Sequence, residues 1–354
     1  MRQIQAENYS IEIGSLVDSS FQDVLIGRYK DSNKVILVDE NTHDCCLEYL
    51  LTNFEELKDA EVMLLPVGEE NKVMEVCFQV FEALSEYQIG RKDLVINLGG
   101  GVVSDMGGFI ASIYKRGIDF INIPTSLLAM VDASIGGKTG IDLGSYKNQL
   151  GTFTNPKALF IDVSFLQTLP AEEVVNGYAE MLKHALIFDS TYWEELISIA
   201  SMDDLLNEGM IEKSIHLKNK VVLADPLEKD NRKKLNFGHT IGHAIEGFML
   251  DKKTVSHGHA VGIGMLAESY LSYKREVLNE NDWIQIEKVL TTVFPKIIFE
   301  KEDIPKMIRL MRNDKKNFEG QIKCCVLTEI GKCIFDQNVG EKELIEVFTY
   351  LLEN

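Results

Sequence analysis

The stretch NLGGGVVSDMGGF, residues 97–109, places three consecutive glycines between an apolar run and a segment with helical spacing. A backbone without side chains turns tightly and lets a ligand approach its N–H groups. The following helix presents the positive end of its dipole, which attracts anions. The stretch therefore predicts a strand-to-helix turn that binds a phosphate group. The alternative is a turn whose glycines serve only to allow positive φ.

Short runs rich in β-branched residues flank this turn throughout residues 1–163. They are VILVD (35–39), VMLLPV (62–67), LVINL (94–98), FINIP (120–124) and LFIDV (159–163). Between the second and third runs, apolar residues from Val73 to Leu84 repeat with helical spacing. Apolar strands that alternate with helices are typical of a parallel sheet covered on both faces. We expect residues 1–163 to form a Rossmann-like α/β domain.

The pattern changes after residue 163. Long amphipathic segments cover 171–187, 205–225, 236–250 and 258–278, and a short β-like segment at 322–335 precedes a final helix. A chain of 354 residues usually divides into two domains. We therefore expect residues 164–354 to form a second, mainly α-helical domain.

Charge and composition exclude several classes of partner. With 36 basic and 55 acidic residues, the net charge is −19, which argues against nucleic acid or an anionic membrane surface. The N-terminus lacks a signal-peptide pattern, and no run of eighteen apolar residues is present. The six cysteines form no C-x-x-C pair. These features predict a cytoplasmic protein with reduced thiols.

Histidines cluster in the second half of the chain. The motif GHTIGHA (238–244) sets two histidines four residues apart, SHGHA (256–260) adds two more, and YAEMLKHA (178–185) puts a glutamate, a lysine and a histidine on one helical face. A catalytic zinc site takes three protein ligands, commonly histidines with a carboxylate. Spacing alone does not select among Glu180, His184, His239, His243, His257 and His259, each of which could instead be a hydrogen-bonded helix residue.

Two further features point to an anionic ligand. The segment 123–153 interleaves Asp132, Lys138, Lys147 and Asn148 with glycines, and its lysines could neutralise a phosphate; a solvated loop is the alternative. Asp39 ends the first apolar run, where an acid can bind a ribose or act as a turn residue.

Five motifs together resemble those of the 3-dehydroquinate synthase family, which belongs to the sugar-phosphate cyclases. In order, they are GGGVVSDMGGF (99–109), RGIDFINIPTSLLAMVDASIGGKTGID (116–142), NGYAEMLKHALI (176–187), RKKLNFGHTIGHAIE (232–246) and HGHAVGIGM (257–265). The resemblance extends from about residue 35 to residue 335. It implies an NAD-binding α/β domain, a helical metal-binding domain and a homodimer.

The resemblance also implies a set of site residues. The zinc ligands, with Co²⁺ as an alternative ion, would be Glu180, His239 and His257. The NAD contacts would be Asp39, Glu69, Lys72, Gly101, Val102, Val103, Ser104, Asp105, Thr125, Ser126, Lys138, Lys147 and Thr168. The substrate and catalytic contacts would be Arg116, Asp132, Lys138, Asn148, Lys183, Lys218, Arg232, Asn236, His243 and one of Lys315 or Lys316.

The implied reaction converts 3-deoxy-D-arabino-heptulosonate 7-phosphate, a phosphorylated sugar acid, into 3-dehydroquinate and phosphate. It proceeds by transient oxidation with NAD, phosphate elimination, re-reduction and an intramolecular aldol closure. Such an enzyme is a lyase of the shikimate pathway and of aromatic amino acid and chorismate biosynthesis. The alternatives are another sugar-phosphate cyclase, such as a 2-deoxy-scyllo-inosose synthase, and a metal-dependent polyol dehydrogenase. Arg232 and the lysines favour a substrate with a carboxylate.

The chain departs from the usual family pattern at three positions. His259 stands where an acid is usual, and Ser104 and Gly107 also differ from the common residues. Because His259 lies two residues from a proposed ligand, we expect it to affect the environment of the metal.

Overall fold

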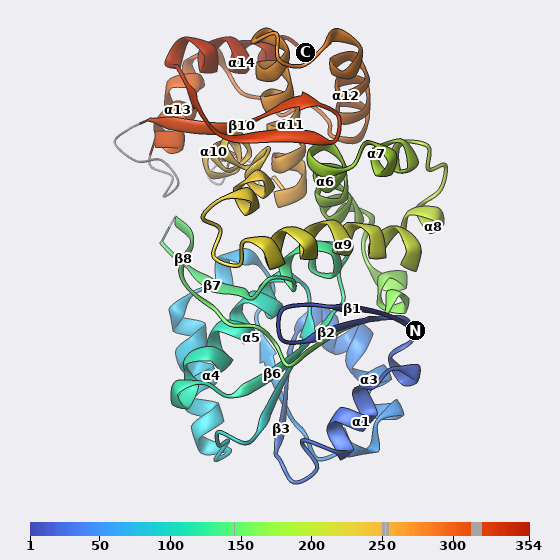
Figure 1. The fold of residues 1–354 in the computed structure, drawn as a ribbon. Helices are drawn as coiled ribbons and strands as arrows, with labels where there is room; N and C mark the ends of the chain where they lie inside the picture. Colours follow the sequence, from blue (N-terminus) through green and yellow to red (C-terminus); the bar gives the residue numbers. More distant parts are fainter. Residues whose placement is uncertain (145, 250–251, 253–254, 313–320) are drawn as a thin grey trace. The chain divides into compact units, whose positions relative to one another are not determined.

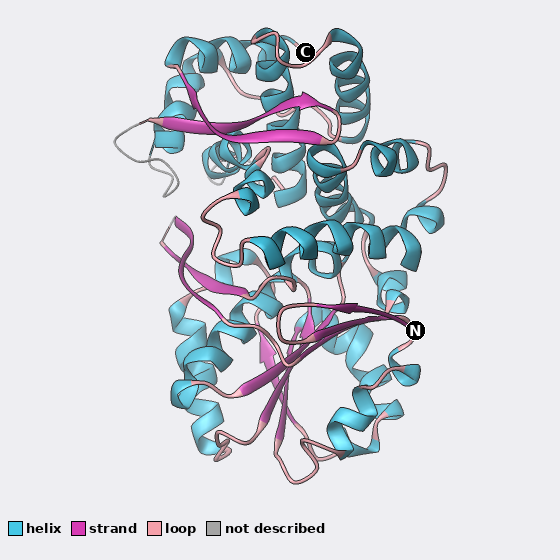
Figure 2. Ribbon diagram, in the orientation of Figure 1, coloured by secondary structure: helices cyan, strands magenta, loops and turns pink. Residues whose placement is uncertain are grey.

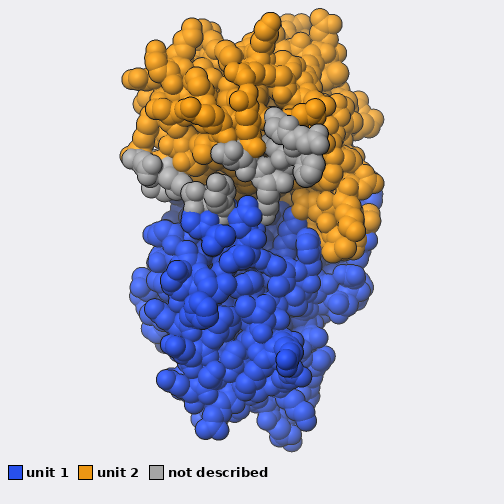
Figure 3. Space-filling view, turned by 90° about the vertical axis from the view of Figure 1, so that its left-hand side faces the viewer, with its two compact units in different colours: residues 1–174, 206–223 blue, residues 175–205, 224–354 orange. Residues whose placement is uncertain are grey.

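The computed structural model describes residues 1–354 except 145, 250–251, 253–254 and 313–320. The chain forms two compact units, one of residues 1–174 with 206–223 and one of residues 175–205 with 224–354 (Figure 3). The predicted order, an α/β region followed by a mainly helical region, is confirmed. The domain boundary expected after residue 163 remains a prediction.

A seven-stranded sheet organises the first unit. Its strand order is β1 (Arg2–Gln5), β2 (Ser10–Ile13), β9 (Ala158–Ile161), β6 (Asp119–Pro124), β5 (Leu94–Gly99), β3 (Lys34–Asp39) and β4 (Glu61–Leu65). All neighbouring pairs are parallel except β1 with β2. The five predicted strands are all present. The antiparallel β1–β2 pair at the edge was not predicted.

Helices cover both faces of this sheet (Figures 1 and 2). The α-helices are α1 (Phe21–Ile26), α2 (Glu40–Thr42), α3 (Glu48–Asn53), α4 (Met74–Glu86) and α5 (Gly101–Ile113), and α9 (Glu208–Ala224) contributes its residues up to Leu223. Short helical turns are η1 (Leu16–Asp18), η2 (His43–Leu47), η3 (Glu55–Leu57), η4 (Glu69–Asn71), η5 (Tyr114–Arg116), η6 (Ala129–Ala133) and η7 (Val163–Thr168). The predicted apolar stripe lies on α4, where Cys77, Val80 and Leu84 are buried.

The glycine run connects β5 to α5, as predicted, but its glycines do not have positive φ. Gly100 is the N-cap of α5 with φ −74°. Close packing explains Gly107, about two helical turns later, because a Cβ there would lie 2.0 Å from Asn97 Oδ1. The helix can therefore lie directly on the strand that precedes it. The alternative explanation of the run by positive φ is wrong.

A two-stranded hairpin occupies much of the polar segment 123–153. It consists of β7 (Lys138–Leu143) and β8 (Tyr146–Phe153), with Lys138 opposite Phe153 and Ile141 opposite Leu150. Ile141 is fully buried in the core formed with α5. The sequence did not predict these strands, because glycines and charged residues interrupt the alternation that marks a half-buried strand.

The second unit is mainly helical. Its helices are α6 (Ala171–Phe188, whose first turn lies in the first unit), α7 (Ser190–Ile197), α8 (Met202–Leu205), α10 (His239–Met249), α11 (His257–Lys274), α12 (Glu280–Val293), α13 (Ile304–Arg312) and α14 (Glu341–Glu353), with the turns η8 (Asn231–Asn236) and η9 (Lys301–Asp303). The predicted β-like segment forms the hairpin β10 (Ile322–Glu329) and β11 (Lys332–Val339). Within the described residues, no helix is both long and apolar enough to cross a membrane. All six cysteines are free, and Cys45 is exposed.

Candidate active site

Three helices of the second unit bring Glu180, His239 and His257 together. Glu180 lies in α6, and the two histidines are the first residues of α10 and α11. The Nε2 atoms of His239 and His257 lie 3.6 Å and 3.8 Å from Glu180 Oε1. One possible ligand atom from each residue lies within 4.8 Å of the others. The spacing of the sequence left six candidates open, and the structure brings together the three that the resemblance implied.

The surroundings of Glu180 fit a divalent cation. Its side chain is completely buried, and neither oxygen accepts a hydrogen bond of ordinary geometry from a described residue. A buried carboxylate is costly unless its charge is compensated. The buried ammonium of Lys183, one turn along α6, forms an ion pair with Glu180 Oε2 and leaves Oε1 facing the two imidazoles. One carboxylate and two imidazoles are a donor set typical of catalytic zinc.

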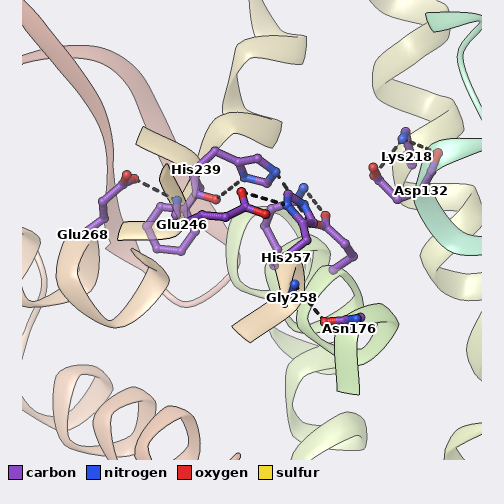
Figure 4. Close-up of polar contacts among 12 residues, drawn as sticks. Asp132, Asn176, Lys218, His239, Glu246, His257, Gly258 and Glu268 are labelled. Carbon is purple, nitrogen blue, oxygen red and sulfur yellow. Dashed lines mark hydrogen bonds and ion pairs between the residues drawn. The ribbon is translucent and has the colours of Figure 1, made fainter. Parts of the chain in front are cut away.

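Buried side chains fix the first residues of α10 and α11. Glu268 accepts a 3.0 Å hydrogen bond from the N–H of Gly238, and Asn176 accepts one of 3.0 Å from the N–H of Gly258 (Figure 4). Both glycines are adjacent to a ligand candidate in the sequence. The main chains of α10 and α11 also approach closely, because a Cβ on Gly264 would lie 1.9 Å from the carbonyl oxygen of Gly238. The main chain beside His239 and His257 is therefore held by two buried side chains and by the close approach of the backbones.

His243 lies one turn after His239 on α10. Its ring centroid lies 5.1 Å from that of His239 and 6.0 Å from that of His257. His243, Glu246 and His257 form a second group whose possible ligand atoms lie within 4.8 Å of one another. His243 is thus beside the candidate metal centre, where the resemblance implied a catalytic role.

His259 belongs to none of the possible ligand groups among the described residues, and His184 is fully buried in α6. His259 Nε2 lies 2.5 Å from the carbonyl oxygen of Pro295, and its ring stacks on Phe294. The expected effect of His259 on the metal environment has no support in these contacts.

The segment 225–236 positions Arg232 and Asn236. Asp225 accepts hydrogen bonds from the N–H groups of Lys229, Asp230 and Arg232 at 2.9, 2.7 and 3.1 Å. The Arg232 guanidinium is 1% exposed and donates to the Pro226 carbonyl at 2.7 Å. Burial alone would raise the pKa of Asp225, but the three backbone donors outweigh it and hold this pKa below its usual value. Asn236 donates to Glu228 Oε1 at 2.9 Å.

In the first unit, the glycine turn and the segment after β6 lie side by side. The N–H of Thr125 donates to the carbonyl of Gly99 at 3.0 Å, and Ser126 Oγ accepts from the N–H of Ala129. Gly101, Val102, Val103, Ser104 and Asp105 form the first turn of α5, with Val103 in the core and Ser104 Oγ 3.2 Å from Ser134 Oγ. The first turn of α5 and the segment after β6 thus lie together at the carboxyl ends of β5 and β6, where open α/β sheets bind ligands.

Other proposed cofactor contacts have local roles. Asp39 caps the turn after β3 by accepting from the N–H of Thr42 at 2.8 Å, which is the turn role considered as the alternative. Thr168 ends η7 and donates to the Phe165 carbonyl at 3.5 Å.

A buried lysine connects the glycine turn to the hairpin. Lys72 Nζ donates to Asp105 Oδ2 at 2.6 Å and to Asn148 Oδ1 at 2.8 Å. Glu69 lies 3.7 Å from both Lys72 and Lys147. Burial lowers the pKa of Lys72, but the carboxylates of Asp105 and Glu69 outweigh it, and the pKa stands well above its usual value. Lys72 is therefore charged across the neutral range.

The remaining predicted residues occupy separate places. Lys218 on α9 forms a 2.7 Å ion pair with Asp132 of η6. Lys138 is exposed at the start of β7. Arg116 follows the far end of α5, about 20 Å along the helix from the glycine turn, so the first unit does not bring it to that turn. Lys315 and Lys316 lie outside the described residues.

Three residues at the candidate metal centre were missed. Glu246 lies three residues after His243 and seven after His239, so the helical spacing of GHTIGHAIE could have revealed it. Asn176 lies one turn before Glu180 on α6, which is a weaker signal. Glu268 reaches Gly238 from 30 residues away, and no local pattern indicates this contact.

Comparisons with known proteins give a consistent result. A family model described as 3-dehydroquinate synthase N-terminal matches residues 62–176, and one described as 3-dehydroquinate synthase C-terminal matches residues 177–317. A 3-dehydroquinate synthase of Parabacteroides distasonis is 37% identical over 339 residues, which cover 95% of this chain and 96% of that protein.

Solved structures have the same fold. A 2-epi-5-epi-valiolone synthase of Streptomyces hygroscopicus, with NAD⁺ and Zn²⁺ bound, aligns with a TM-score of 0.85 and 26% identity over 100% of this chain and 99% of that chain. A 2-deoxy-scyllo-inosose synthase, complexed with carbaglucose-6-phosphate, NAD⁺ and Co²⁺, aligns with a TM-score of 0.84 and 24% identity over the same shares of the two chains.

Proposed function

Because the chain belongs to the 3-dehydroquinate synthase family and is an enzyme of that activity, we propose that Glu180, His239 and His257 hold its divalent cation and that its α/β unit binds NAD. The reaction is a carbon–oxygen lyase step of the shikimate pathway, which releases phosphate from a phosphorylated sugar acid. Zn²⁺ is the proposed ion and Co²⁺ an alternative, as in the solved relatives.

One observation carries the metal assignment. The Glu180 carboxylate is buried, accepts no ordinary hydrogen bond from a described residue and is faced by two imidazole Nε2 atoms at 3.6 and 3.8 Å. These distances exceed a hydrogen bond but leave room for a cation with bonds of about 2.0–2.2 Å to each atom. The ligand set carries a single negative charge, so the bound cation keeps a net positive charge.

The bound groups supply chemistry that the side chains lack: NAD accepts a hydride and later returns it, and the cation polarises substrate oxygens. The protein itself binds the cofactor, the cation and the substrate and orients them. We propose that the first turn of α5, together with Thr125 and Ser126, holds the phosphates of NAD through N–H and hydroxyl groups. Asp39, Glu69, Lys72, Lys147 and Thr168 complete the proposed cofactor contacts.

The substrate carries a carboxylate and a phosphate, which require cationic partners. In the second unit, Lys183 and Arg232 are each 1% exposed, and a buried cation is costly unless anions compensate its charge. We propose that these two cations bind substrate anions, that Asn236 orients hydroxyls and that His243 moves a proton beside the metal. In the first unit, Lys138, Asn148, Asp132, Lys218 and Arg116 are the proposed contacts.

The assay follows phosphate release and nicotinamide absorbance together. The enzyme with Zn²⁺ and NAD⁺ is given either the heptulosonate 7-phosphate or a hexose 6-phosphate, which lacks the carboxylate. Phosphate release from the first substrate without lasting NADH supports the proposal. NADH that accumulates in proportion to product indicates a polyol dehydrogenase, and preference for the hexose phosphate indicates another cyclase.

Two further proposals extend the family assignment. We propose a homodimer that works in the cytoplasm, with neither nucleic acid nor a membrane as partner, in keeping with the charge of −19. Sedimentation equilibrium measures the mass directly; a mass of twice 39.9 kDa supports the dimer, and a mass of 39.9 kDa contradicts it.

A further inference from the structure

The ring of His257 lies between two carboxylates. Its Nε2 is 3.8 Å from Glu180 Oε1, and its Nδ1 is 3.8 Å from Glu246 Oε2 (Figure 4). The Glu246 side chain is 8% exposed, and its residue lies on the inward face of α10, two turns after His239. Each nitrogen of the His257 imidazole therefore faces a different carboxylate.

His239 has the same arrangement with a different acceptor. Its Nε2 faces Glu180 at 3.6 Å, while its Nδ1 lies 3.2 Å from the carbonyl oxygen of Phe237. Each histidine thus turns Nε2 toward Glu180 and Nδ1 toward an oxygen. For His239 that oxygen is a neutral carbonyl, and for His257 it belongs to a carboxylate. A histidine that binds a metal usually donates its second N–H to such an acceptor, which fixes the tautomer and the ring orientation.

We propose that Glu246 is a positioning residue of the metal centre, which accepts the Nδ1–H of His257 and so directs Nε2 toward the cation; this inference rests on the metal site proposed above. The present separation exceeds a hydrogen bond by less than about 1 Å, so a small side-chain rotation closes it. The negative charge of Glu246 also makes the imidazole a stronger donor to the metal than a neutral acceptor would.

The assignment differs from direct ligation by Glu246. Glu246 also belongs to the group with His243 and His257 that could hold an ion by itself. In that arrangement His257 would bind the ion through the nitrogen that faces Glu246, and Glu180 would take no part. The proposed arrangement instead needs Glu180 as a ligand and Glu246 as the partner of an N–H. Variants at the two glutamates separate these possibilities.

Titration of the metal-free full-length protein with Co²⁺, followed by visible absorption, tests the proposal. The Glu246→Gln variant keeps the shape and a hydrogen-bond acceptor but removes the charge. We expect the Co²⁺ affinity to fall about 10- to 100-fold and the absorption bands to shift, with one ion still bound per chain. The Glu246→Asp variant, which keeps the charge, should retain more affinity than Glu246→Gln.

The matched control is Glu343→Gln in the same unit, where the carboxylate pairs with Arg275 at 2.7 Å. It should bind Co²⁺ like the unmodified protein. An affinity within twofold of the unmodified protein for Glu246→Gln would overturn the proposal. Complete loss of binding in Glu246→Gln, with binding retained in Glu180→Gln, would also overturn it, because Glu246 would then be a ligand.

Failure of this inference can be told apart from failure of the metal assignment. If the unmodified protein binds no Co²⁺, the metal site itself is wrong. If it binds Co²⁺ and loses it in His257→Ala, while Glu246→Gln binds Co²⁺ with unchanged affinity, the site stands and Glu246 has no positioning role. Thermal unfolding of each metal-free variant shows whether any loss of affinity comes from loss of the fold.

Discussion

The ammonium of Lys72 and the side-chain oxygen of Asn148 are joined by a 2.8 Å hydrogen bond, although the two residues are 76 positions apart in the chain. The same ammonium binds Asp105 at 2.6 Å in the first turn of α5. One buried charge thus connects the turn proposed for NAD to the hairpin proposed for the substrate.

Replacement of Lys72 should destabilise the first unit. Lys72→Met leaves the Asp105 carboxylate without its partner, and loss of one member of a buried ion pair costs about 3–5 kcal/mol. Lys147→Met removes a partly exposed lysine that lies 3.7 Å from Glu69, and loss of such an ion pair should cost below about 1 kcal/mol. Urea unfolding of the two variants compares the costs. Equal values would show that the Lys72 network does not stabilise the unit.

Two glycines of α5 should respond differently to alanine. At Gly107 the new Cβ meets Asn97 Oδ1 at 2.0 Å, and such overpacking costs about 1–3 kcal/mol. At Gly101 the nearest atom is the Ala133 Cβ at 3.6 Å, an ordinary contact, so stability should change by less than about 0.5 kcal/mol. If NAD approaches this backbone, Gly101→Ala weakens NAD⁺ binding without a change in unfolding. Calorimetric titration with NAD⁺ and thermal unfolding measure the two effects separately.

Two histidines that lie two residues apart on α11 should differ in their effect on metal binding. His257→Ala removes a proposed ligand and should abolish bound Zn²⁺, while NAD⁺ binding survives. His259→Ala removes a contact with the Pro295 carbonyl and should keep full metal content. Metal analysis of both purified variants gives the result. Full Zn²⁺ content in His257→Ala would remove this residue from the ligand set.

Chelation should also lower the stability of the protein. A ligand that binds the folded state at 100 times its Kd contributes about 2.7 kcal/mol of unfolding free energy. The metal-free protein should therefore melt at a lower temperature than the zinc-loaded protein, and Glu180→Gln should show a smaller difference. A melting temperature that does not change on removal of Zn²⁺ would argue against a site within the folded core.

The hydrogen bonds that Asp225 accepts in the segment 225–232 should make the protein less stable in acid. Burial by itself raises the pKa of Asp225, but the hydrogen bonds from three backbone N–H groups lower it by a larger amount. The folded-state pKa therefore lies below the unfolded value of about 3.9. The stabilising contribution is complete above the unfolded value and is lost as the pH falls through the folded value. Asp225→Asn should be less stable than the unmodified protein at pH 7, and the difference should shrink below about pH 4. Thermal unfolding between neutral and acidic pH measures this, and a constant difference would contradict the assignment.

Much of the fold follows from local patterns in the sequence. The strands β3, β5 and β6 are continuous apolar runs, and α10 and α11 begin within the motifs that suggested helices. The hairpin β7–β8 was missed because its stability comes from packing of Ile141 against α5, and not from alternation along its own strands. Strands β1 and β2 were missed for a related reason, since β2 joins the sheet by pairing with β9, where Ser10 lies opposite Ala158.

The metal candidates show a similar limit. Spacing on one helix indicated His239 and His243, but the proposed metal group combines residues from α6, α10 and α11. The Nδ1 atoms of His239 and His257 face oxygens of Phe237 and Glu246, and these contacts exist only after the helices pack. Sequence patterns therefore suggest the residue types, whereas tertiary packing selects the members.

The backbone contact between Gly264 and Gly238 limits how the proposed metal centre can change. The three atoms nearest to a Cβ on Gly264 would be backbone atoms of Gly238 and Gly242, so a larger residue at this position would push the main chains apart. The first atoms of both histidines hence behave as a rigid template, and only ring rotation remains to adjust to ions of different radius. Substitutions that change the metal preference should accordingly lie among the residues that accept hydrogen bonds from the ring N–H groups. Substitutions that destroy the centre should lie among the small residues where the two helices cross.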